Sequence, residues 1–123
     1  SEEAALEAGE KALKGLGEVE GTIAPFGICS AGSKVETRYP EIGPTTNHPY
    51  CPTLKGKITD SIVPEGVASI PEIVIDGMDL AAVKRGMRAA MEGAAGVEGL
   101  LRISAGNYGG KLGKHRIYLR EFL

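Results

Sequence analysis

Residues 101–114 read Leu-Arg-Ile-Ser-Ala-Gly-Asn-Tyr-Gly-Gly-Lys-Leu-Gly-Lys and predict a strand that ends in a glycine-rich loop. Apolar residues alternate with Arg102 and Ser104, as in a half-buried strand, and four glycines then fall within residues 106–113. Glycine lets backbone approach a ligand closely, and inward-turned N–H groups attract anions. With Lys111 and Lys114 at its rim, the loop is a candidate cradle for an anion or a carbonyl oxygen. The alternative is a loose hairpin whose glycines only supply positive φ angles.

The composition predicts one globular domain over residues 1–123, with 42% apolar and 24% charged residues. The 18 glycines and 7 prolines indicate many turns. A formal net charge of −2 argues against general nucleic-acid binding, which needs a basic surface. No apolar run approaches the ~20 residues that span a bilayer, and the first residues lack the pattern of a signal peptide. We therefore expect a cytoplasmic protein with no membrane span.

The periodicity predicts two helices and several strands. Residues 2–16 and 80–94 carry apolar stripes at helical spacing, and Asp79 is a plausible N-cap of the second helix. Residues 19–35 and 69–76 read as extended, and we expect residues 115–123 to pair with residues 99–105 in a hairpin. Two helices on one face of a mainly antiparallel sheet predict an α+β two-layer sandwich of ferredoxin-like type. The uncovered sheet face would need another lobe or a second copy, so we expect a homo-oligomer.

A proline-rich segment, residues 36–67, carries five of the seven prolines and no clear periodicity. Its centre places polar side chains between prolines that fix the backbone, which predicts the wall of a binding site. Candidate lining residues in it are His48, Tyr50, Cys51 and Lys55. Elsewhere, Ser-Ala-Gly occurs at residues 30–32 and again at 104–106, each time after an apolar run, which is weak evidence for two similar loops that face one site.

Glu72 is the exceptional residue of the strand at 69–76, because it stands between Ile70 and Val74. Burial there would favour the neutral carboxyl, which could donate a proton; an edge-strand glutamate that faces water is the alternative. His48 and Cys51, with Cys29 and His115, offer enough ligands for zinc, but no spacing pairs the second two. A Cys51 nucleophile with a His48 base is equally unsupported by the spacing. We therefore predict no metal site.

Three stretches together resemble one enzyme family, formylmethanofuran:tetrahydromethanopterin formyltransferase. They are Asn-His-Pro-Tyr-Cys-Pro-Thr-Leu at residues 47–54, Glu-Ile-Val-Ile-Asp-Gly at 72–77, and Ile-Ser-Ala-Gly-Asn-Tyr-Gly-Gly-Lys-Leu-Gly at 103–113. The resemblance covers nearly the whole chain and corresponds to the family's C-terminal lobe. It implies transfer of a formyl group between methanofuran and N5 of tetrahydromethanopterin in one-carbon metabolism, including methanogenesis, with no bound cofactor. It also implies that an N-terminal lobe or further subunits complete the cleft.

The resemblance gives the candidate residues roles. Formyl transfer passes through a tetrahedral oxyanion, so it needs hydrogen-bond donors and a proton donor, for which Glu72 is the candidate. Donors to the substrates would come from the glycine-rich loop, and Lys55 and Lys111 would face substrate carboxylates and phosphate. The proposed substrate-binding residues are His48, Tyr50, Cys51, Lys55, Ser104, Asn107, Tyr108, Gly109, Gly110 and Lys111. A non-catalytic one-lobe paralogue that binds a pterin or an anion, or serves assembly, remains the alternative.

Overall fold

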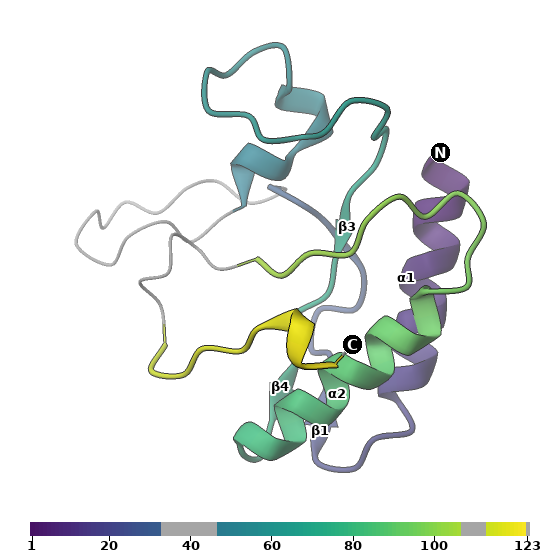
Figure 1. Ribbon diagram of the computed structural model, residues 1–123, viewed down its shortest axis with the longest axis vertical. Coiled ribbons are helices and arrows are strands. Elements are labelled where there is room, and N and C mark those ends of the chain that lie inside the picture. The colour runs from purple at the N-terminus through teal and green to yellow at the C-terminus, as the bar shows by residue number, and fades with distance from the viewer. Residues whose placement is uncertain (33–46, 107–112, 123) are drawn as a thin grey trace.

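The computed structural model describes residues 1–32, 47–106 and 113–122 (Figure 1). Its architecture is α+β, with two 15-residue helices and a small antiparallel sheet. The elements run in the order α1 Glu2–Leu16, β1 Thr22–Ile23, β2 Cys29–Ser30, η2 His48–Tyr50, η3 Pro52–Leu54, β3 Pro71–Glu72, β4 Asp76–Gly77, α2 Leu80–Ala94 and η5 Leu119–Phe122. Both predicted helices are confirmed.

Local capping explains where each helix begins. The Ser1 hydroxyl accepts a hydrogen bond from the Ala4 amide at 3.1 Å, and the Asp79 carboxylate accepts one from the Ala82 amide at 2.7 Å. Each bond satisfies a backbone donor that has no partner within its own helix. Asp79 is therefore the N-cap that its position in the sequence predicts.

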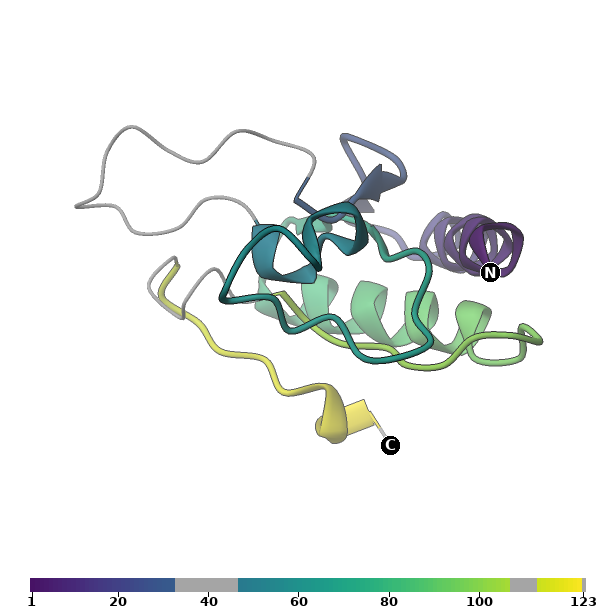
Figure 2. The same cartoon turned by 90° about the horizontal axis from the view of Figure 1, so that it is seen from above.

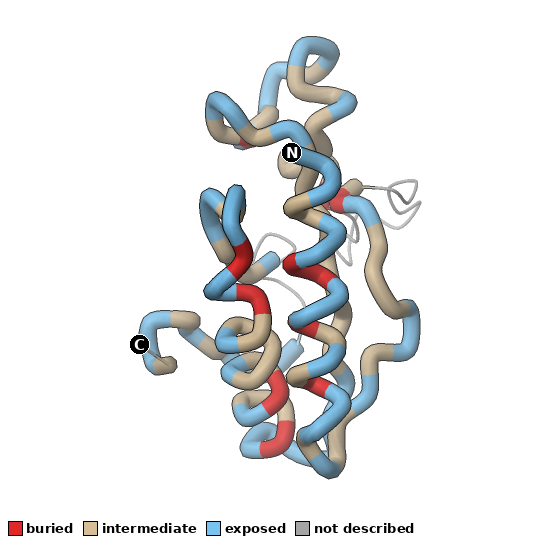
Figure 3. Tube along the Cα trace, turned by 90° about the vertical axis from the view of Figure 1, so that its right-hand side faces the viewer, coloured by how far each residue is buried: buried red, intermediate tan, exposed pale blue. Residues whose placement is uncertain are grey.

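The two helices pack against each other through small residues. They lie side by side, α2 crosses α1 obliquely, and they run in opposite directions (Figures 2 and 3). A side chain on Gly15 would have its Cβ only 2.6 Å from the carbonyl oxygen of Ala89, and one on Gly93 would collide with the carbonyl oxygen of Lys11. The buried cluster around this contact is correspondingly small: Ala8, Ala12, Ala94 and Val97. Close backbone approach thus replaces large side chains at the helix contact.

The four strands are two parts of one interrupted antiparallel pairing. Thr22 pairs with Gly77 in β1–β4, whereas Cys29 pairs with Glu72 in β2–β3. Between these pairs, residues 24–28 stand opposite residues 73–75, so one strand holds two more residues than its partner. A turn that the Gly27 amide closes on the Ala24 carbonyl at 3.2 Å takes up the excess. Pro25 lies in this bulge, outside the ladder, as expected for a residue that cannot donate a hydrogen bond.

The predicted hairpin of residues 99–105 with 115–123 is wrong. Within the described residues no ladder joins these segments, and Figure 1 draws both as coil up to η5. Residues 119–122 form the short helix η5, which begins with a hydrogen bond from the Glu121 amide to the Tyr118 carbonyl at 3.0 Å. An ion pair of 3.2 Å between Glu121 and Lys84 holds η5 against α2. Alternating polarity suits a strand, but here these local bonds and the contact with α2 replace strand pairing.

Candidate functional site

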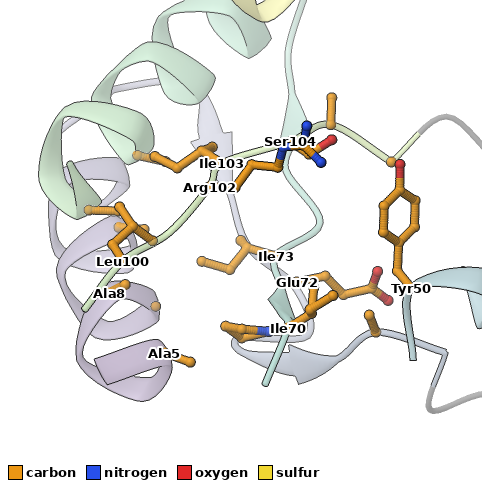
Figure 4. Close-up of a pocket in the computed structure, with 18 of the residues that line it drawn as sticks. Ala5, Ala8, Tyr50, Ile70, Glu72, Ile73, Leu100, Arg102, Ile103 and Ser104 are labelled. Atoms are coloured by element: carbon orange, nitrogen blue, oxygen red, sulfur yellow. The ribbon is translucent and has the colours of Figure 1, made fainter. Parts of the chain in front are cut away.

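A cavity of about 470 Å³ lies between the helices, residues 69–75 and residues 99–106 (Figure 4). Its walls are mainly apolar. Met87 and Met91, on the apolar face of α2, line this cavity, whereas the buried Gly86 faces Leu16 of α1. The segment that flanks β3 contributes Ile70, Ile73 and Ile75. A mainly apolar space of this size is suited to a small organic substrate.

Glu72 places a carboxylate at one end of the cavity. It belongs to β3, where pairing with Cys29 of β2 fixes its backbone. Its side chain points toward the end where Tyr50 lies (Figure 4). The Asn47 side-chain amide donates a hydrogen bond to Glu72 Oε2 at 2.8 Å. Because this donor lies in a partly buried setting, it holds the carboxylate in one orientation.

Asn47 is the buried polar residue of the site, with 8% of its surface exposed. Its backbone carbonyl begins η2 by accepting a hydrogen bond from the Tyr50 amide at 2.9 Å. Its side chain does not cap that helical turn, so the amide is available to Glu72. Asn47 therefore positions two lining residues, Tyr50 through its backbone and Glu72 through its side chain.

Two glycines approach Asn47 from different segments. A Cβ on Gly106 would lie 2.6 Å from the Asn47 amide nitrogen, and one on Gly32 would lie 3.4 Å from the Asn47 carbonyl oxygen. These are the glycines of the repeated Ser-Ala-Gly sequence, and Ala31, Ser104, Ala105 and Gly106 line the cavity. The weak sequence repeat thus marks two segments that meet at one residue.

A model of a known protein family matches nearly the whole chain. The family model described as the FTR proximal lobe matches residues 1–122. The chain belongs to the FTR proximal-lobe family. This confirms the resemblance that the three sequence stretches carry.

The chain is similar to proteins named formylmethanofuran–tetrahydromethanopterin formyltransferase or formyltransferase-like. It is 62% identical over 119 residues to a formyltransferase-like protein of Methanopyrus kandleri, covering 97% of this chain and 40% of that protein. It is 48% identical over 122 residues to the formyltransferase of Methanocaldococcus jannaschii, covering 95% of this chain and 40% of that protein. The chain thus spans about two fifths of the length of these relatives.

Solved structures show the same fold. The formylmethanofuran:tetrahydromethanopterin formyltransferase from Methanosarcina barkeri superposes with a TM-score of 0.85 at 43% identity, covering 100% of this chain and 42% of that chain. The formyltransferase/hydrolase complex of Methylorubrum extorquens, in complex with methylofuran, gives a TM-score of 0.81 at 41% identity, covering 98% of this chain and 40% of that chain. At these identities the likeness extends beyond architecture to the family itself.

In this proximal lobe, Tyr50, Glu72 and Ser104 come together at the cavity. The other predicted residues that the structure describes do not appear among its lining residues. The His48 ring nitrogen Nε2 lies 2.9 Å from Asp60 Oδ2. Lys55 Nζ donates to the Pro64 carbonyl at 3.3 Å and to Glu65 at 3.2 Å, and Cys51 is partly buried in the turn after η2. The predicted residues Asn107, Tyr108, Gly109, Gly110 and Lys111 lie outside the described residues.

Neither cysteine of the lobe joins a ligand cluster. Cys29 donates a long hydrogen bond of 3.6 Å to the Phe26 carbonyl, and both Cys29 and Cys51 are free thiols. Among residues 1–32, 47–106 and 113–122, no group of three or more histidine, cysteine, aspartate or glutamate side chains is arranged to hold a metal ion. No helix in the same residues is long and apolar enough to cross a membrane.

Two polar residues of the site were not singled out from the sequence. Asn47 carries a recognisable signal, since asparagine before a proline-containing helical turn is a common cap, but that signal predicts a bond to backbone rather than to Glu72. Arg102, which also lines the cavity, looks like an ordinary outward residue of a strand. Both assignments need the tertiary arrangement of segments that are distant in sequence.

Proposed function

We propose that this chain forms the catalytic lobe of an enzyme that transfers a formyl group between methanofuran and N5 of tetrahydromethanopterin. The observation that carries the proposal is the Glu72 carboxylate at the end of an apolar cavity, held by the buried Asn47 amide. The names of the relatives support the choice of substrates.

The reaction exchanges one C–N bond for another. The N5 amine attacks the formyl carbon, a C–N5 bond forms, and the carbonyl oxygen becomes an oxyanion. The C–N bond to the methanofuran amine then breaks, and that nitrogen takes up a proton while N5 loses one. Such a reaction needs a group that can both give and accept a proton, together with donors for the developing negative charge.

Glu72 is the proposed proton donor. In its protonated form it gives its proton to the leaving methanofuran nitrogen, and the resulting carboxylate recovers a proton from N5. Ser104, on the facing segment of the cavity wall, is the proposed donor to the oxyanion, together with the loop that follows it. The apolar walls strengthen these polar interactions because they exclude water.

The proposal also covers the location, assembly and cofactor use of the enzyme. We place the enzyme in the cytoplasm, working as an oligomer and without a bound prosthetic group, with both one-carbon carriers as substrates. We also propose that the interrupted sheet and its two helices derive from a ferredoxin-like sandwich. Further contacts to substrate would come from residues that do not line the described cavity, namely His48, Cys51, Lys55 and the glycine-rich loop.

Replacing Glu72 tests the mechanism. In the full-length gene product, Glu72→Gln keeps the shape and the hydrogen bond from Asn47 but removes the proton, so the rate of formyl transfer should fall by about 10²–10⁴-fold. The assay follows formation of N5-formyl-tetrahydromethanopterin from formylmethanofuran in single-turnover mixtures.

The matched control is Glu92→Gln. This substitution makes the same chemical change on the exposed face of α2, where Glu92 pairs with Arg88 at 3.0 Å, and it should leave the rate unchanged. An unaltered rate in Glu72→Gln would remove Glu72 from the mechanism. A wild-type protein that transfers no formyl group between these carriers would refute the proposed activity itself.

A further inference from the structure

We propose that Asn47 is a positioning residue that holds the Glu72 carboxyl group in its reactive orientation, and that Gly106 is a glycine because its backbone must fit against this asparagine. The proposal rests on the proposed function, since it concerns how the general acid is oriented. It adds a residue that lies in the proline-rich segment, 25 positions before the acid that it orients.

The hydrogen bond itself has the geometry of a positioning contact. Asn47 Nδ2 lies 2.8 Å from Glu72 Oε2. Among the described residues, Asn47 is the hydrogen-bond partner of the Glu72 carboxyl group, and it contacts one of the two carboxyl oxygens. The other oxygen, Oε1, is left for the proton that the reaction moves. An amide N–H can only donate, so it selects the oxygen that is not protonated and leaves the acidic O–H on the other.

Asn47 is fixed independently of Glu72. Only 8% of its surface is exposed, and its backbone carbonyl accepts a hydrogen bond from the Tyr50 amide at 2.9 Å. A residue anchored in this way loses little further side-chain entropy when it binds a carboxyl group. The orientation of Glu72 is therefore prepared before substrate arrives, which is what electrostatic catalysis requires.

The glycines show how tightly the amide is enclosed. A methyl group on Gly106 would stand 2.6 Å from Asn47 Nδ2, closer than real Cβ atoms approach such a neighbour. Gly106 does not adopt a positive φ, so the requirement there is space rather than backbone conformation. At Gly32, a methyl group would lie 2.9 Å from His48 Cα, next to Asn47. Gly106 thus packs directly against the Asn47 carboxamide, whereas Gly32 packs against the backbone next to it.

A double-mutant cycle separates positioning from simple structural support. In the full-length gene product, Asn47→Ala should lower kcat about 10- to 100-fold, the cost of losing a hydrogen bond to an ionisable group, with KM changed by less than about twofold. In a Glu72→Gln background the same substitution should change kcat by less than about twofold, because the acid is already absent. An equal loss in both backgrounds would show that Asn47 only supports the structure and would overturn the proposal.

Two further variants control for stability and charge. Asp79→Ala removes the N-cap of α2, which lies outside the cavity. It should lower the stability of the fold, as Asn47→Ala also does, while leaving kcat unchanged. Asn47→Asp places a second carboxyl group against Glu72 and should lower kcat more than Asn47→Ala does. An Asn47→Asp enzyme with wild-type kcat would also contradict the proposal.

A spectroscopic measurement tests the contact without any activity. The chain contains two asparagines, Asn47 and Asn107, and no glutamine, so it contributes two pairs of carboxamide cross-peaks to a ¹⁵N-correlated spectrum. Glu72→Ala should move the Asn47 carboxamide signal and speed its exchange with solvent, whereas Glu92→Ala should not. An Asn47 signal that does not respond to Glu72→Ala overturns the positioning role even if the enzyme proves to be a formyltransferase. A responding signal in a protein that transfers no formyl group would instead refute the proposed function alone.

Discussion

At the scale of single residues, Gly32 and Gly27 give a matched pair. Both adopt left-handed backbone angles, with φ of 71° and 60°, but a Cβ on Gly32 would lie 2.9 Å from Cys51 Cβ, whereas one on Gly27 would meet nothing within 4 Å. Gly27→Ala should cost about 1 kcal/mol in backbone strain alone. Gly32→Ala should lower the free energy of unfolding by about 2–4 kcal/mol, because a steric clash adds to the strain. Urea denaturation of the two variants measures the difference, and equal losses would disprove the tight fit at Gly32.

The sequence indicates Glu72 because a carboxyl group between Ile70 and Val74 breaks an apolar pattern, and that signal is local. The partner of Glu72 is not local, since it comes from a proline-rich segment in which every polar residue looks equally suitable. His48 and Lys55 illustrate the difficulty: their types suit ligand binding, but the structure pairs them with Asp60 and Glu65. Residue type alone does not reveal which polar side chains already have partners.

At the scale of elements, the contact between α1 and α2 reverses the usual effect of glycine in a helix. Alanine normally stabilises a helix interior by about 1 kcal/mol relative to glycine. At Gly93 the added methyl group would strike the Lys11 carbonyl and force the helices apart. Gly93→Ala should therefore lower the free energy of unfolding by about 1–3 kcal/mol.

Gly96 supplies the control for this prediction. It follows α2, and a Cβ there would meet nothing within 4 Å. Gly96→Ala should change stability by less than about 0.5 kcal/mol, or increase it slightly. Thermal and chemical unfolding of the two variants provide the comparison. A stabilised Gly93→Ala protein would contradict the close approach of the helices.

The elements also explain why the helices were predictable and the sheet was not. Helix formation depends on signals that act within a few positions, namely caps such as Ser1 and Asp79 and the helical spacing of apolar residues. Such local signals can be recognised in the sequence alone. The strands are two residues long because the five residues 24–28 face the three residues 73–75, and only the paired structure reveals that mismatch. Residues 116–120 alternate in polarity as a strand does, yet residues 119–122 form η5, which contacts α2 instead.

At the scale of the whole molecule, the described residues leave several large apolar side chains exposed. They include Met78, which is 87% exposed, and Ile23, which is 63% exposed. Exposed apolar surface of this kind is typical of a face that another chain or lobe covers.

We therefore expect this chain to be stabilised by association with another copy. Association favours the folded state by mass action, so the midpoint of thermal unfolding should rise by about 3 °C for each tenfold increase in concentration of a dimer. Differential scanning fluorimetry from 1 to 100 µM, with sedimentation equilibrium on the same samples, makes the measurement. A constant midpoint together with a monomeric mass would exclude self-association.

The pairing of α1 with α2 has a consequence for synthesis on the ribosome. The 63 residues between Leu16 and Leu80 must be made before the second helix begins. At 5–20 residues per second, translation of that interval takes about 3–13 s. An isolated helix of 15 residues is only marginally stable in water, so nascent α1 must remain largely unstructured and chaperone-accessible for those seconds. Translational pausing between residues 17 and 79 would prolong that exposure, whereas pausing after α2 has left the exit tunnel would not.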